Sequence, residues 1–134
     1  MSILRLSFLV STEHQAAELL TARLVESGPM TVIKVVGDLD MSTTHLLTEL
    51  ADAVLQAHSP LVMTLDLAGL RFLCADGIRA LLQVRDAAAA RSTHLVLQDP
   101  SPITCRVLKV TDLLDAFEIK TSGAAALTAP PARL

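Results

Sequence analysis

The sequence has few aromatic residues and little net charge. Among its 134 residues are three Phe and neither Tyr nor Trp, and the formal net charge is -3. Proteins that bind single-stranded nucleic acid stack bases on aromatic side chains, and duplex binders carry a basic patch. Acidic and basic residues are interspersed here, so no such patch forms. We therefore expect no nucleic-acid partner.

Long apolar runs and a cysteine framework are also missing. Apolar residues make up 51% of the chain, yet no run approaches the roughly 20 consecutive apolar residues of a membrane span. Residues 3–10 are apolar but lack a basic region before them and an obvious cleavage site after them. Two cysteines make a poor disulfide framework. We expect a soluble, cytoplasmic protein without direct membrane insertion.

Metal-ligand patterns are absent as well. The histidines are scattered without the spacing of a metal pair: His14, His45, His58 and His94. The two cysteines are too far apart in the sequence for a zinc knuckle. Asp38 and Asp40 could suggest a metal site or an acid and base pair, but the end of a strand and the start of a helix explain them. We expect no metal and no cofactor.

Strand and helix signals alternate along the chain. Residues 19–26 alternate apolar and polar side chains, a Ser-Gly-Pro turn follows at 27–29, and residues 31–37 are rich in Val and Ile, which predicts a hairpin. A helix is predicted next, with Ser42 or Thr43 as its N-cap and leucines at helical spacing up to residue 58. Residues 61–67 predict a buried central strand.

The stretch RFLCADGIRALL, residues 71–82, then runs through a tight turn into a second helix. A strand at 94–97, a helix at 103–108 and a last strand at 117–120 complete the pattern. The order predicts an α/β fold, with a mixed, mostly parallel sheet that begins with a hairpin and has helices packed on it. The length fits a single domain over residues 16–120. Residues 1–15 would be an extension, either an extra strand or a short helix, and residues 121–134 a mobile tail.

Four segments in this order carry a family resemblance. They are GDLD at 37–40, LDLAGL at 65–70, FLCADGI at 72–78, and PSP at 100–102 ahead of Val107 and Leu108. Together they resemble the STAS domain of bacterial anti-sigma factor antagonists, over roughly residues 19–120. The resemblance implies a regulatory protein, not an enzyme, that binds an anti-sigma factor with a kinase fold and so releases a sigma factor. The resemblance does not decide whether the protein forms a homodimer.

The resemblance also implies a phosphorylation switch, from which this sequence departs. The family pattern at the junction is Asp-Ser-Ser/Thr-Gly, with the first Ser phosphorylated at a helix N-terminus. Here Cys74, Ala75 and Asp76 occupy those three positions. Ala75 has no hydroxyl, so phosphate cannot be added at this position. The departure affects regulation, not the fold.

Asp76 raises the hypothesis that a fixed carboxylate imitates a permanently phosphorylated state. The competing interpretation is that an acidic residue in a first helical turn interacts favourably with the helix dipole, worth about 0.3 to 1 kcal/mol, and needs no further role. A carboxylate is also smaller and less charged than a phosphate. Asp76 lies one residue beyond the acceptor position.

The two cysteines raise a redox hypothesis. Cys74 is placed at a helix N-terminus, which favours thiolates, and Cys105 is expected in the following helix at the same edge of the sheet. Against a disulfide, a helical wheel places Ile103, Val107 and Val110 on one face and Cys105 on the other. Free cysteines more often pack as small hydrophobic residues.

An enzyme remains a further alternative. Cys74 and Arg79 flank a strand-to-helix turn in a manner similar to the anion-binding loop of rhodanese-like and phosphatase-like proteins. Asp76 would place a like charge in the anion site, and the phosphatase spacing has one more residue between Cys and Arg.

The expected partner surface gathers three segments where helices begin. Its residues are Asp38, Leu39, Asp40, Ser42, Thr43, Arg71, Phe72, Cys74, Ala75, Asp76, Gly77, Arg79, Ser101 and Pro102. Other hydroxyls could substitute as phosphorylation sites, although caps and turns explain them equally well: Ser42, Thr43, Thr44, Ser101 and Thr104. A second class of protein is also consistent with the missing serine. This is a non-enzymatic STAS subunit that docks on a transporter, as in lipid-transport assemblies.

Overall fold

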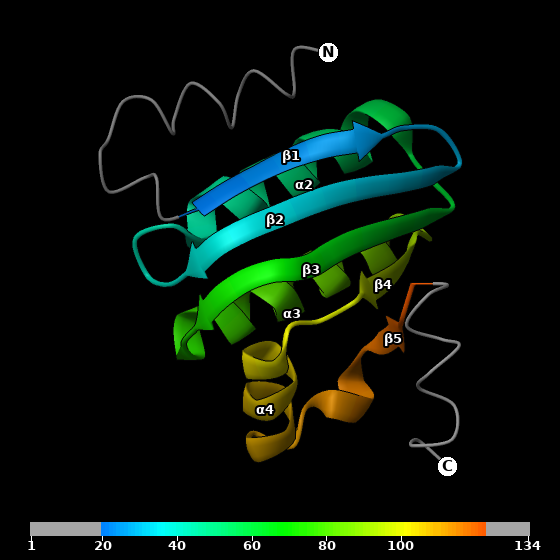
Figure 1. Cartoon of the computed structure of the whole chain (residues 1–134). Coiled ribbons are helices and arrows are strands. Elements are labelled where there is room, and N and C mark those ends of the chain that lie inside the picture. Colours follow the sequence, from blue (N-terminus) through cyan, green and yellow to red (C-terminus); the bar gives the residue numbers. More distant parts are fainter. Residues whose placement is uncertain (1–19, 123–134) are drawn as a thin grey trace.

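The computed structural model describes residues 20–122, and the chain begins there with a β-hairpin (Figure 1). Strands β1 (Leu20–Glu26) and β2 (Met30–Leu39) pair antiparallel. The turn between them uses Gly28 at a φ of 125°, a conformation that residues with a side chain rarely adopt. The predicted hairpin is confirmed.

Three parallel strands extend the sheet beyond the hairpin. They are β3 (Val62–Leu73), β4 (His94–Gln98) and β5 (Glu118–Lys120), and the strand order is β1-β2-β3-β4-β5. The connections run through helices α2 (Thr44–His58), α3 (Ala75–Ala90) and α4 (Pro102–Val110), with a 3-10 turn, η2 (Leu114–Ala116), before β5. The predicted α/β class, with a mixed and mostly parallel sheet, is confirmed.

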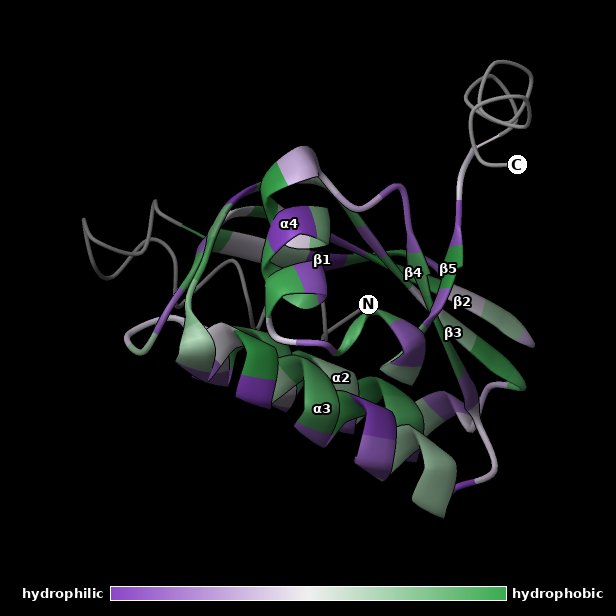
Figure 2. Cartoon of the chain, turned by 90° about the horizontal axis from the view of Figure 1, so that it is seen from below, coloured by the Kyte–Doolittle hydropathy of each residue, from purple (hydrophilic) through white to green (hydrophobic). Residues whose placement is uncertain are grey.

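Helices α2 and α3 form one layer against the sheet (Figure 2). The buried side chains of both helices belong to the same hydrophobic core as alternate residues of β1 and β2, among them Leu20, Ala22, Ile33 and Val35. The alternation of the hairpin strands therefore matches a sheet with one face on the core. No helix within the described residues is long and apolar enough to cross a membrane.

The central strand is longer than the sequence predicted. We expected a strand over residues 61–67, but β3 continues to Leu73. Its pairing with β2 shifts register twice, between Lys34 and Val36 and between Gly37 and Asp38 of β2, so that β3 gains an extra residue at each shift. Such bulges break the period of two, which is why the pattern hid the second half of this strand.

Helix α4 buries a polar residue against the sheet. Its buried residues are Thr104 and Leu108, whereas Val110 is 78% exposed. The helix packs against β3, beyond the point where the pairing between β3 and β4 ends (Figure 1). The structure buries a threonine there whose hydroxyl is hydrogen-bonded to Ser101.

The boundaries of the domain remain a prediction. The expected extension at 1–15 and most of the expected tail at 121–134 lie outside the described residues.

Gly77 is the residue that lets α3 approach the sheet. A Cβ atom at this position would lie 2.6 Å from the carbonyl oxygen of Leu39 and 2.6 Å from Cδ1 of Leu73. We expect Gly77→Ala to lower the free energy of unfolding by about 1 to 3 kcal/mol, because the helix must move away from the strand ends. Urea unfolding would measure the loss. Ala75→Gly, an exposed change in the same turn, is the control and should cost less than about 1 kcal/mol. Equal effects would contradict the close-packing role.

Candidate functional site

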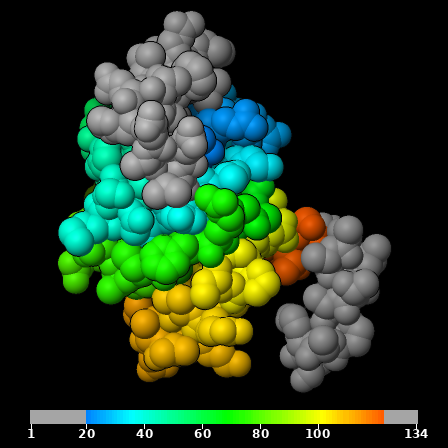
Figure 3. All heavy atoms as spheres, turned by 60° about the vertical axis from the view of Figure 1, so that its left-hand side comes forward, coloured from blue at the N-terminus to red at the C-terminus, as the bar shows by residue number. Residues whose placement is uncertain are grey.

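The carboxyl ends of β2 and β3 lie side by side and bring two predicted segments together. Leu39 is paired with Leu73 across the two strands, and the backbone N–H of Cys74 donates a hydrogen bond to the carbonyl of Leu39 at 3.3 Å. In the space-filling view the cyan loop near residue 40 adjoins the green segment beyond residue 70 (Figure 3). We call the loop at 38–44 and the segment at 71–79 the junction surface.

The loop after β2 is held by hydrogen bonds to Asp40. Its Oδ1 accepts bonds from the backbone N–H of Ser42 at 2.9 Å and from the Ser42 hydroxyl at 2.8 Å. These bonds, first that of the Ser42 side chain, hold the pKa of Asp40 below its ordinary value, against a smaller opposing effect of burial. Asp40 therefore acts as an ionised anchor for the turn.

Thr43 is the N-cap of α2, one of the two predicted caps, but its side chain does not cap the helix. It is buried, and its Oγ1 donates to the carbonyl of Asp38 at 2.8 Å and accepts from the backbone N–H of Asp40 at 2.9 Å. Thr43 thus fixes the shape of the loop from inside. A kinase could not reach this hydroxyl without opening the loop.

The start of α3 is open to solvent at Ala75. Cys74 is the N-cap of α3, with an extended backbone, and its carbonyl accepts the first helical hydrogen bond from Ile78 at 3.0 Å. Ala75, the first residue of the helix, is exposed. Because the first N–H groups of a helix lack partners inside it, this end favours anions. The methyl group of Ala75 therefore lies at a helix end that favours anions.

Two ion pairs border this position. Arg79 Nη1 lies 3.2 Å from Asp76 Oδ1, and Arg71 Nε lies 3.6 Å from Asp38 Oδ1. Both arginine side chains are mostly exposed, so each pair contributes little to stability. Arg79 is paired with the neighbouring carboxylate of Asp76, which the sequence analysis did not predict.

Two large apolar side chains stand out of this surface. Met41 is 74% exposed and Phe72 is 48% exposed. Sequence reasoning included Phe72 but missed Met41, although an apolar residue inside the polar loop GDLDMST was a signal. Close by is a hollow of about 120 Å³, lined by Met41, Thr44, Asp76, Arg79, Ala80 and Gln83.

Several predicted surface residues lie inside the molecule. Leu39 and Gly77 are buried and shape the strand ends, as described above. Ser101 is 8% exposed, and its hydroxyl lies 2.9 Å from that of Thr104, which is fully buried. The turn before α4 therefore presents Pro102 to solvent.

The cysteines are free thiols in the structure, and both are partly exposed. Cys105 Sγ lies 3.7 Å from the carbonyl oxygen of Pro100, within reach of a weak hydrogen bond. Within the part of the chain that the structure describes, no group of three or more His, Cys, Asp or Glu side chains could hold a metal ion.

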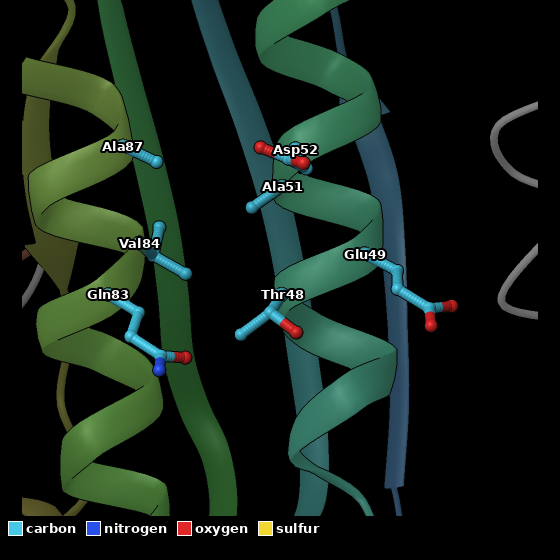
Figure 4. A pocket seen from close by; sticks show the side chains of 7 residues that line it. All are labelled: Thr48, Glu49, Ala51, Asp52, Gln83, Val84 and Ala87. Atoms are coloured by element: carbon cyan, nitrogen blue, oxygen red, sulfur yellow. The ribbon is translucent and has the colours of Figure 1, made fainter. Parts of the chain in front are cut away.

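A larger hollow of about 240 Å³ lies between α2 and α3 (Figure 4). It is lined by Thr48, Glu49, Ala51, Asp52, Gln83, Val84 and Ala87. Gln83 lines this hollow and also the smaller one beside the junction surface. The two hollows are therefore neighbours on the surface, and sequence reasoning did not anticipate the larger one.

Comparison with known proteins decides the family. A family model described as "Mlab, STAS domain" matches residues 22–121, most of the chain. The chain belongs to the STAS domain family. This confirms the resemblance found from the four sequence segments. The chain matches no curated protein.

Solved structures agree with this assignment. The STAS domain is similar to an anti-sigma factor antagonist from Mycobacterium paratuberculosis, with 25% sequence identity, a TM-score of 0.68, and coverage of 82% of this chain and 92% of that one. It is also similar to the anti-sigma factor antagonist SpoIIAA in its unphosphorylated form, with 15% identity, a TM-score of 0.64, and coverage of 86% and 97%. An anti-sigma factor antagonist (STAS) domain protein from Planctomyces limnophilus is similar with 20% sequence identity and a TM-score of 0.65. The match covers 81% of this chain and 96% of that one. At the two lower identities, the similarity establishes the fold alone.

The hydrogen bonds of Asp40 make the stability of the loop dependent on pH. The folded-state pKa is below the ordinary value of 3.8, so the stabilising effect is present above that value and is lost as the pH falls through the folded pKa. We expect Asp40→Asn, which keeps an acceptor but loses the charge, to be less stable at pH 7 by on the order of 1 kcal/mol. Urea unfolding at pH 7 and about pH 2.5 would measure the difference.

The difference between wild type and Asp40→Asn should shrink at the lower pH, because protonation then removes part of the charge of Asp40. Asp115→Asn serves as the control, since Asp115 is exposed and makes no hydrogen bond through its side chain within the described residues. A difference that is the same at both pH values would contradict the role of the ionised carboxylate.

Proposed function

We propose that this STAS domain is a regulatory protein that binds and sequesters an anti-sigma factor with a kinase fold through its junction surface. The single observation that carries the proposal is the placement of exposed Ala75 at the start of α3, bordered by exposed Met41 and Phe72. The binding state would not be controlled by phosphate at this position, because Ala75 accepts none.

The composition of the junction surface supports protein binding. Interfaces are enriched in Met, aromatic residues and Arg, and a few such residues carry most of the binding energy. Here Met41, Phe72 and Arg79 are all exposed around a small hollow. The rigid ends of β2 and β3 hold them in place, so little ordering is needed on binding.

Phosphorylation occurs in at least one protein of similar fold. SpoIIAA is known in an unphosphorylated and in a phosphorylated form, and both resemble this chain in fold. Adding a phosphate places close to two negative charges on a surface and can break an interface by repulsion and desolvation. With Ala75, this STAS domain would remain in the binding-competent state.

Asp76 contributes to this surface as an ordinary helix residue. Its Oδ1 lies 3.2 Å from Arg79 Nη1, and the Asp76 side chain is 37% exposed. The neighbouring guanidinium offsets much of its charge. This arrangement favours the helix-dipole interpretation over imitation of a phosphate.

A second candidate is a non-enzymatic STAS subunit of a transporter assembly. The family model that matches the chain has the designation Mlab and not that of an antagonist. A subunit of this kind needs no acceptor hydroxyl either, so Ala75 fits both candidates. Neighbouring genes for a sigma factor and kinase, or for a transporter, would distinguish them.

A catalytic role for Cys74 has less support. Arg79 pairs with Asp76, and the chain belongs to a family whose solved relatives are regulators of sigma factors. We therefore propose that the STAS domain is not an enzyme.

Affinity capture from lysate, followed by mass spectrometry, tests the proposal. The tagged full chain should retain a protein with a kinase-type fold, and Ala75→Glu should not, because it introduces a charge at the centre of the surface. Capture of transporter subunits, lost in the same variant, would favour the second candidate. Equal capture by both chains would contradict a role for the junction surface.

Phe72 should be a principal contact with the captured partner. We expect Phe72→Ala to weaken binding at least about tenfold, because exposed aromatic residues are typical binding hot spots. Isothermal titration calorimetry with the captured partner would measure this. Val110→Ala removes a side chain that is 78% exposed on α4 and serves as the control. An affinity unchanged by Phe72→Ala would contradict the proposed surface.

Restoring the hydroxyl should restore the switch. If the captured partner has kinase activity, Ala75→Ser should incorporate phosphate from ATP, whereas wild type should not at this position. Phosphopeptide mass spectrometry would locate the modification, and Ala75→Gly is the matched control without a hydroxyl. Failure of Ala75→Ser to be modified by an active partner kinase would show that the junction surface is not presented to its active site.

A further inference from the structure

The hollow between α2 and α3 has a small, apolar floor. Val84 is buried at its base, and the side chains of Ala51 and Ala87 are single methyl groups. A ligand could therefore come close to the backbones of both helices there. Thr48 adds to this floor: its Oγ1 donates to the carbonyl of Thr44 at 3.3 Å, and Figure 4 shows its methyl group on the side facing α3. A groove of this form between two parallel ridges suits the packing of a third helix.

Two polar side chains line the groove without a partner. Figure 4 places Gln83 of α3 with its amide directed toward α2, and Asp52 of α2 at the outer edge of the groove. Neither side chain makes a hydrogen bond or an ion pair with any residue that the structure describes. Asp52 is exposed, so its charge is available to a ligand.

The charge of α2 selects the kind of ligand. The helix contains Glu49 and Asp52 but neither Lys nor Arg along its whole length. An occupant with Lys or Arg opposite Asp52 is therefore complementary in charge, and an acidic occupant would be repelled. Glu49 adds to the negative potential, although its side chain points away from α3 in Figure 4.

We propose that this groove is the docking site for a basic amphipathic helix of the protein that binds the junction surface. The occupant would insert small aliphatic side chains over Ala51 and Ala87 and pair a Lys or Arg with Asp52. Gln83 links the groove to the junction hollow, so one partner can cover both. The identity of the partner rests on the proposed function, but the chemistry of the groove does not.

The test uses peptides and not the natural partner. A displayed library of 16-residue helical peptides, with Lys, Arg, Glu and Gln varied on one face, would be selected against the full-length chain. We expect enrichment of Lys and Arg. Asp52→Lys should then weaken the selected peptides at least about tenfold, by replacing an attraction with a repulsion. Ala87→Trp, which fills the groove, should abolish their binding.

Matched variants separate the groove from its surroundings. Asp115→Lys changes charge at an exposed position outside α2 and α3, and Ala90→Trp adds the same bulk to an exposed position of α3. Both should keep the affinity of the selected peptides within about threefold. Thermal unfolding of all four variants would confirm that each is folded.

Three outcomes would overturn the proposal: enrichment of acidic peptides, binding insensitive to Asp52→Lys and Ala87→Trp, or binding that appears only after deletion of residues 2–15. The last would assign the groove to the chain's own N-terminal segment. If Phe72→Ala weakened peptide binding and the groove variants did not, the peptides would bind the junction surface and not the groove. Because no natural partner is used, failure here would leave the proposed function standing, and failure of affinity capture would leave the groove standing.

Discussion

The contact between the end of β2 and the first turn of α3 organises this molecule. The carbonyl of Leu39 accepts the backbone N–H of Cys74 and lies so close to Gly77 that a side chain there would meet it at 2.6 Å. This contact places the start of α3 beside the loop after β2. Through it, a strand end, a helix N-terminus and a hydrogen-bonded turn become one rigid surface, which is what a binding site needs to limit the entropy lost on association.

Much of the fold was predictable because its signals are local. The hairpin followed from alternation in β1 and from the turn containing Gly28, and α2 followed from leucines at helical spacing. The second half of β3 was not predictable, since its two register shifts depend on how β2 lies beside it. The burial of Thr104 on α4 was not predictable, because its hydroxyl is satisfied by Ser101, which hydrophobicity cannot indicate.

The candidate site was also predictable only in part. The sequence predicted the family, which is confirmed, and from the family followed the hypothesis of a binding surface without an acceptor hydroxyl at Ala75. The sequence could not tell which residues of that surface face solvent. Leu39, Thr43 and Ser101 proved buried, while Met41 joined the surface only when two distant segments were brought together. The groove between α2 and α3 depends on helix packing and left no mark on the sequence.

We propose that this STAS domain binds its partner through the junction surface, without a regulatory hydroxyl at position 75. Hydrogen–deuterium exchange of the full chain, with and without its captured partner, tests this most directly. The account predicts that the partner slows exchange at residues 38–44 and 71–79. Protection confined to the hairpin turn near Gly28, at the opposite end of β2, would contradict it.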